Sequence, residues 1–258
     1  MTQFETLMVE TVEKALVVRL NRPENRNAIS IRMMAELVEV LTEANQLKGV
    51  SAVIVTGNES VFSSGRDLKE AAASGDPSAA IAAWHRVTDS MEQCAKPVIA
   101  AIEGHCLTGG LELALACDLR VAGEGAQFGI TSSRLGTLPG FGASQRLPRL
   151  IGASRALELL FMADVIGTAE AYRIGLVNRQ TEQGAALQEC LNMARTLGER
   201  APLSLAAMKK AVYGGIEMPL AEAIQWELPI AASLSQSRDR KEGMAAFAEK
   251  RKPNFTGE

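Results

Sequence analysis

The chain has 258 residues with a formal net charge of −3, and 47% of its residues are hydrophobic. This length and composition are typical of one large globular domain, or of one domain with a smaller appendage. Proteins that bind the phosphate backbone usually carry an excess of basic residues, so the charge argues against a nucleic-acid partner.

The first half of the chain alternates predicted strands and helices. Two short runs, 7–10 and 15–20, predict a β-hairpin. Ser30 is a favourable N-cap for a helix whose apolar residues recur at helical spacing between Met33 and Ala44. The other predictions are strands at 52–56, 97–102 and 119–122, helices at 79–93 and 109–117, and turns or loops at 61–68, at 104–108 and after 122.

From Ala143 onward the pattern is mostly helical. The predicted helices cover 143–150, 153–163, 168–174, 185–200, 203–213, 219–233 and 238–250. Because β/α units come first and helices last, we expect an α/β fold. The character of the sequence changes near residue 200, which predicts an α/β core at 1–200. The helical region at 201–258 would then serve docking or oligomerisation, or complete the core.

The four cysteines and the histidines His85 and His105 form no metal-binding pattern. No two cysteines have CxxC spacing, so we expect reduced thiols, no bound metal and no tightly bound cofactor. The first ten residues lack the basic start and apolar core of a signal peptide. No apolar run reaches the roughly 18 residues of a membrane span. We therefore expect a cytoplasmic protein without a membrane partner.

Glu112 is the strongest candidate for chemistry. Its neighbours in 111–116 are all apolar, so the carboxylate lies either at a helix edge or inside the protein. Burial would raise its pKa toward the range of a general acid or base. Gly109 lies one helical turn earlier on the same side, where a free N–H can bind a developing oxyanion. From these residues alone, a surface glutamate stabilised by the helix dipole is equally plausible.

A second candidate is the segment 62–68, Phe-Ser-Ser-Gly-Arg-Asp-Leu, whose glycine turn can expose a backbone N–H to a ligand. Alone it favours an ordinary loop. Together with the segment around Glu112, it resembles the crotonase (enoyl-CoA hydratase/isomerase) superfamily. The resemblance covers nearly the whole chain, and its other matching segments are 21–23, 27–29, 96–101, 104–112, 117–118, 126–129, 135–140, 145–147 and 247–251.

The resemblance implies a role for each matching residue. The backbone N–H groups of Arg66 and Gly109 would hold the thioester oxygen and stabilise an enolate, each contributing about 3–4 kcal/mol. Glu112 would move the proton. The substrate would be an acyl-CoA, so that coenzyme A enters as part of the substrate. Residues implied in binding it are Arg26, Ala28, Ser64, Gly65, Asp67, Leu68, Lys69, Gly110, Ser132 and Gly140, with Phe247 and Lys250 reaching the coenzyme A of a neighbouring subunit.

The family's architecture is also implied. The fold would be a crotonase-like spiral of β-β-α units with a helical C-terminal trimerisation region. The assembly would be a homotrimer or a dimer of trimers. The side chain of Arg66, which stands where alanine is common, would meet a phosphate of coenzyme A, a substrate carboxylate or solvent. Gly140 and Phe141 stand where some family members place an aspartate or a tyrosine.

The chain departs from the family's hydratases at one position. Those enzymes carry a second glutamate three residues after the Phe-Gly pair, where this chain has Ser132. A serine hydroxyl cannot act as a carboxylate base near neutral pH, and losing one acid/base group typically costs about 10²- to 10⁴-fold. The resemblance favours an enoyl-CoA hydratase-type lyase. An isomerase or a decarboxylase using one glutamate, and a non-catalytic acyl-CoA-binding protein, stay open as alternatives.

Overall fold

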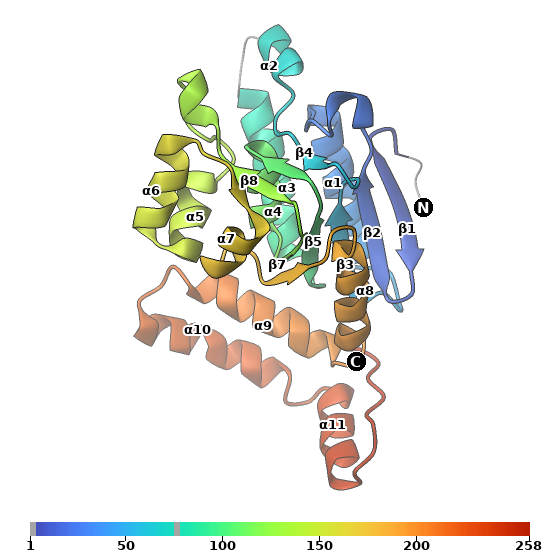
Figure 1. The fold of residues 1–258 in the computed structure, drawn as a ribbon. Coiled ribbons are helices and arrows are strands. Elements are labelled where there is room, and N and C mark those ends of the chain that lie inside the picture. The colour runs from blue at the N-terminus through green and yellow to red at the C-terminus, as the bar shows by residue number, and fades with distance from the viewer. Residues whose placement is uncertain (1–3, 75–77) are drawn as a thin grey trace.

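The protein, described by a computed structural model over residues 4–74 and 78–258, contains two β-sheets (Figure 1). The larger sheet runs in the order β1-β2-β3-β5-β7-β10, and only its β1–β2 pair is antiparallel. Its strands are β1 (Leu7–Val12), β2 (Ala15–Leu20), β3 (Ala52–Thr56), β5 (Val98–Ile102), β7 (Leu119–Gly123) and β10 (Arg179–Thr181). The smaller sheet runs β4 (Val61–Ser63), β6 (His105–Leu107), β8 (Gln127–Gly129) and β9 (Ile166–Gly167).

Three successive units of the chain follow one pattern. Each unit places one strand in the larger sheet and the next strand in the smaller sheet, and then continues into helices. The strand pairs are β3–β4, β5–β6 and β7–β8. The predicted α/β spiral of β-β-α units is therefore confirmed, as is the β1–β2 hairpin. The helices are α1 (Ile31–Ala44), α2 (Leu68–Ser74), α3 (Ser78–Gln93), α4 (Gly109–Ala116), α5 (Ala143–Ile151), α6 (Ala153–Met162), α7 (Thr168–Arg173), α8 (Ala186–Leu197), α9 (Pro202–Gly215), α10 (Leu220–Ser233) and α11 (Arg238–Ala248).

Helices cover both faces of the larger sheet, which explains why its central strands are continuously apolar. Val53 and Val55 face the main core beneath α1, α3 and α4, whereas Ala52 and Ile54 face α8. The N-cap predicted for α1 is confirmed, because Ser30 Oγ accepts the N–H of Met33 at 3.1 Å.

Five short strands were missed by the sequence analysis. The segment 61–68, expected to be a loop, begins with β4. The turn expected at 104–108 contains β6, and the loop expected after 122 contains β8. Strands β9 and β10 lie between the predicted helices of the region that was expected to be mostly helical. Each has only two or three residues, so none is long enough to display the alternation that marks a strand.

The last three helices lie at one end of the molecule, opposite α2 (Figure 1). Helix α9 contacts α3 and pairs with α10. It is also tied to the core by an ion pair between Lys209 Nζ and Asp118 Oδ2 at 2.8 Å. Over the described ranges, no helix combines the length and the hydropathy needed to cross a membrane.

Candidate active site

The turn at Gly65 and Arg66 lies directly against the start of α4. Thr108 Oγ1 donates to the carbonyl of Ser64 at 3.2 Å. Gly65 has φ of +112°, and a Cβ there would come within 1.8 Å of Thr108 Oγ1, so only glycine permits this approach. A Cβ built on Gly109 would lie 3.0 Å from the N atom of Arg66. The two backbone amides that the sequence singled out are therefore neighbours.

Both of these amides are available to a ligand. Among the residues that the structure describes, the N–H groups of Arg66 and Gly109 donate no hydrogen bond to the protein. Gly109 is the first residue of α4, where an N–H has no partner inside the helix and the helix dipole favours negative charge. Two unpaired donors side by side form a binding site for one electron-rich oxygen.

The position of Arg66 is fixed by the segment that precedes α1. Ile29 N–H donates to the Gly65 carbonyl at 2.7 Å, and Asp67 N–H donates to the Ile29 carbonyl at 3.0 Å. Asp67 also pairs with Arg22 at 2.9 Å and accepts N–H groups from α2. Burial acts to raise the pKa of Asp67, but these N–H groups and Arg22 outweigh it and lower that pKa. Its carboxylate thus holds the turn in place.

Glu112 lies inside the protein, with 3% of its surface exposed. Its Oε1 accepts two backbone N–H groups, from Phe141 at 2.8 Å and from Ala143 at 3.0 Å. Burial raises the pKa of Glu112 to about 7, although these two hydrogen bonds and the positive charge of Arg146 act to lower it. The alternative of a surface glutamate is wrong. This carboxylate can both accept and donate a proton near neutral pH.

Phe141 was not among the site residues that the sequence predicted, yet it connects several parts of the site. Its N–H binds Glu112, and its carbonyl accepts the indole N–H of Trp84 at 2.7 Å. The two rings stack with centroids 4.2 Å apart. The guanidinium carbon of Arg66 lies 5.9 Å from the centre of the Phe141 ring. The signal in the sequence was the resemblance, which places Gly140 and Phe141 where some family members have an aspartate or a tyrosine.

The residues expected along the path of coenzyme A share one rim. Ser64 N–H donates to the Arg26 carbonyl at 3.0 Å, and the Ala28 carbonyl accepts from Arg22 at 2.6 Å. The side chains of Arg26, Leu68 and Lys69 are exposed there. These residues lie around the turn that carries the Arg66 amide.

Three predicted residues differ in how they contribute. Gly110 is needed for packing, because a Cβ there would come within 2.4 Å of the Ser63 carbonyl oxygen. Ser132 begins a 3₁₀ turn (Ser132–Leu135) and is 9% exposed. Within the described part of the chain its hydroxyl has no hydrogen-bond partner, so it is free to bind a ligand or water. Gly140 is exposed and has open space around its α-carbon.

Phe247 and Lys250 are not brought to Glu112 within one chain. Phe247 lies on α11 and Lys250 follows that helix, at the opposite end of the fold from α2 (Figure 1). The ring of Phe247 is 85% exposed.

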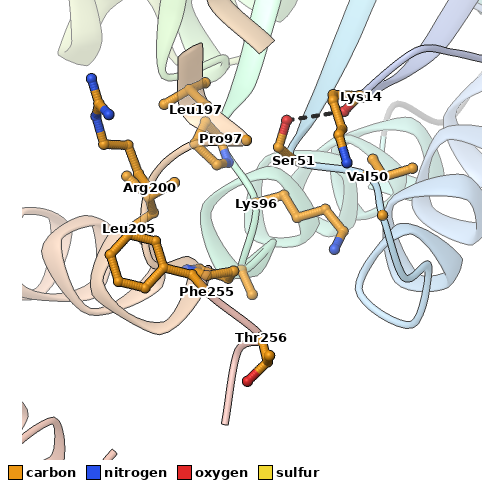
Figure 2. A pocket seen from close by; sticks show the side chains of 14 residues that line it. Lys14, Val50, Ser51, Lys96, Pro97, Leu197, Arg200, Leu205, Phe255 and Thr256 are labelled. Atoms are coloured by element: carbon orange, nitrogen blue, oxygen red, sulfur yellow. Dashed lines mark hydrogen bonds between the residues drawn. The ribbon is translucent and has the colours of Figure 1, made fainter. Parts of the chain in front are cut away.

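Other cavities lie outside this site. One of about 580 Å³ is formed by α3, α4, α5 and α9, and Phe141 and Trp84 line it. Another, of about 170 Å³, contains Lys14, Lys96 and Phe255 (Figure 2). It opens before β3 and β5, whereas the Arg66 and Gly109 amides follow β4 and β6, and none of its residues was predicted for the site. Over 4–74 and 78–258, no cluster of three or more His, Cys, Asp or Glu could hold a metal ion.

Comparison with known proteins gives one family. Residues 10–258 match the family model described as enoyl-CoA hydratase/isomerase. The crotonyl-CoA hydratase of Syntrophomonas wolfei is 37% identical over 261 residues, covering 98% of each chain. The mitochondrial enoyl-CoA hydratase of Pongo abelii is 36% identical, covering 93% of this chain and 82% of that protein. The crystal structure of enoyl-CoA hydratase from Bacillus anthracis is 35% identical, covers 98% of this chain and 100% of its own, and superposes with a TM-score of 0.94. The chain belongs to the enoyl-CoA hydratase/isomerase family.

Proposed function

We propose that this protein is an enoyl-CoA hydratase, which adds water to the C2–C3 double bond of a 2-enoyl-CoA. One observation carries the proposal: a buried carboxylate with a pKa of about 7 lies one helical turn after an unpaired amide, and a second unpaired amide adjoins the first. Relatives named as hydratases, at 36–37% identity over most of the chain, support the same reaction.

The amides of Arg66 and Gly109 hold the thioester oxygen of the substrate. Glu112 takes a proton from a water molecule whose oxygen forms a bond to C3. The electrons of the double bond move toward the thioester, and the resulting negative charge on its oxygen is stabilised by the two N–H groups. Each such donor typically contributes about 3–4 kcal/mol. Glu112 then returns the proton to C2, which completes the 3-hydroxyacyl-CoA and restores the carboxylate.

Coenzyme A extends away from this centre across the rim formed by Arg26, Ala28 and 64–69. The basic side chains of Arg26 and Lys69 are exposed there and suit the phosphates of the ligand. A free carboxylic acid lacks these contacts. Calorimetry is expected to detect acyl-CoA binding and much weaker binding of the matching free acid.

Ser132 supports a second candidate function. A hydratase with two carboxylates divides proton delivery between them, but Ser132 is neutral, so Glu112 works alone. A double-bond isomerase needs only one group that moves a proton between carbons. A decarboxylase needs the oxyanion site more than a base. Both therefore fit a single glutamate.

Incubation with a panel of acyl-CoAs, followed by mass spectrometry, separates these reactions. Hydration adds the mass of water to crotonyl-CoA. Decarboxylation removes carbon dioxide from a malonyl-type thioester, and isomerisation leaves the mass of 3-enoyl-CoA unchanged while moving its double bond. The hydratase proposal fails if crotonyl-CoA gains no water while either other product forms.

The region 201–258 is proposed to form a trimer, or a dimer of trimers. Helix α10 buries none of its 14 residues, although it carries Leu220, Ile224 and Leu228. Phe247 on α11 is almost fully exposed as well. Apolar surface of this kind is typical of a subunit interface. A second copy would also bring its own Phe247 and Lys250 to the coenzyme A rim. Light scattering at micromolar concentration tests this, and a monomer mass would refute it.

A further inference from the structure

We propose that the stacked rings of Phe141 and Trp84 limit the length of the acyl chain, because they separate the acyl site from the cavity of about 580 Å³ behind them. The inference rests on the proposed function, since it takes the thioester to be held at the Arg66 and Gly109 amides. It concerns which acyl groups the site accepts and applies equally to hydration and to isomerisation.

The direction of the acyl chain follows from the fixed groups of the site. Coenzyme A leaves across the rim near Ser64, so the acyl chain runs the other way, past Glu112. The first residue met beyond the Glu112 carboxylate is Phe141, because its N–H binds Oε1 at 2.8 Å. The Phe141 ring also lies beneath the guanidinium of Arg66. An acyl chain that passes Glu112 therefore reaches this ring.

A cavity begins on the other side of the two rings. Phe141, Trp84 and Gly142 line it, whereas Glu112, Arg66 and Gly109 do not. Its apolar part comes from the end of α4 and from helices α5 and α9, through Leu115, Ala116, Leu150 and Ile216. Phe141 thus contacts both the Arg66 guanidinium and this cavity. The cavity has the volume for a longer alkyl chain, and beside these apolar residues its lining includes charged ones such as Asp89, Glu92 and Arg149.

The rings are held in place from several sides. Trp84 and Phe141 are 1% and 5% exposed, and they stack with an interplanar angle of 17°. The indole N–H of Trp84 donates to the backbone carbonyl of Phe141. Because the hydrogen bonds to Glu112 and from Trp84 both use the Phe141 backbone, Phe141→Ala removes the ring and keeps these bonds. The substitution therefore opens the partition without deleting a catalytic group.

The test compares crotonyl-CoA with trans-2-decenoyl-CoA as substrates of the wild type and of Phe141→Ala. We expect the wild type to prefer crotonyl-CoA. In the variant, kcat/KM for decenoyl-CoA relative to crotonyl-CoA should increase about tenfold or more, because each methylene buried from water is worth roughly fourfold in affinity. Phe141→Leu, which keeps an apolar side chain of intermediate size, should give a smaller shift and guards against misfolding of the alanine variant.

Leu150→Ala is the matched control, because Leu150 lines the same cavity from α5 and is not one of the two stacked rings. It should leave the preference for crotonyl-CoA in place. The proposal is overturned if the wild type already processes decenoyl-CoA as well as crotonyl-CoA. It is equally overturned if both folded Phe141 variants keep the wild-type preference.

Failure of the proposed function is distinguishable from failure of this inference. If the wild type hydrates no enoyl-CoA, binding of butyryl-CoA and decanoyl-CoA by calorimetry still reports the length of chain that fits. Tighter binding of decanoyl-CoA by Phe141→Ala than by the wild type, with butyryl-CoA unchanged or weaker, supports the partition. Equal gains for both ligands, or none for either, contradict it.

Discussion

Replacing Glu112 by glutamine is expected to make the protein more stable at alkaline pH while removing its activity. The side chain keeps its size, and its amide oxygen can still accept the N–H groups of Phe141 and Ala143. It can no longer exchange a proton near neutral pH. Loss of a general acid/base typically lowers turnover by about 10²- to 10⁴-fold. Binding of a saturated acyl-CoA should remain close to that of the wild type.

The magnitude of the stability effect follows from the raised pKa of Glu112. Burial moves this pKa from 4.5 to about 7 in the folded protein. Between these pH values the folded state binds more protons than the unfolded state, so the free energy of unfolding of the wild type decreases as pH increases. The full decrease is about 3 kcal/mol, and it is complete above about pH 7. The glutamine variant lacks this decrease.

Denaturant unfolding at fixed protein concentration, from about pH 5.5 to pH 8, measures the difference between variant and wild type. That difference should increase by about 2 kcal/mol in favour of the variant and then level off. Glu39→Gln, which removes an exposed carboxylate from α1, reports the effect of net charge alone. A difference that stays constant with pH would mean that Glu112 is not a buried acid with a raised pKa, and the proposed proton transfer would lose its basis.

Three further predictions concern catalysis. The kcat/KM for crotonyl-CoA should increase about tenfold per pH unit below about pH 7 and level off above it, because Glu112 must be ionised to act as a base. A kcat/KM that does not change with pH would contradict this role of Glu112. Gly109→Ala places a Cβ 3.0 Å from the Arg66 N atom and should lower kcat by about 10²- to 10³-fold, whereas Gly167→Ala, which meets open space, should not. Ser132→Glu should raise the rate of crotonyl-CoA hydration, by less than the roughly 10²- to 10⁴-fold that a well-placed acid contributes. If the wild type hydrates crotonyl-CoA rapidly and the variant is no faster, one glutamate suffices.

Long periodic elements were predictable from the sequence, because each carries its own signal. The hairpin of β1 and β2 and the capped helix α1 both occur where expected. The strands β4, β6, β8, β9 and β10 were missed because each has only two or three residues, whose extended form depends on pairing with distant strands rather than on a local pattern. For example, Cys106 pairs with Phe128, which lies 22 positions later in the chain.

In the site, too, local features were predictable from the sequence and contacts between distant segments were not. The segment around Glu112 indicated a helix that begins at glycine, but it could not distinguish a buried from an exposed carboxylate. Burial depends on the segment at Phe141, which lies 29 residues away and supplies the N–H groups. The stack with Trp84 spans 57 residues. Contacts at such separations depend on the packing of whole elements, so no local pattern of residues could predict them.

The ion pair between Lys209 and Asp118 determines whether the two predicted regions can be separated. Asp118 follows the end of α4, the helix that carries Glu112, and its carboxylate also accepts from Val98 N–H and the Tyr213 hydroxyl. A chain ended at residue 200 would lose both Lys209 and Tyr213. Both residues of this ion pair are partly buried, so losing Lys209 would leave the Asp118 carboxylate without its cationic partner and lower the stability of the core. We therefore expect the helical region to be part of the unit that folds, so that residues 1–200 alone would not form a stable enzyme.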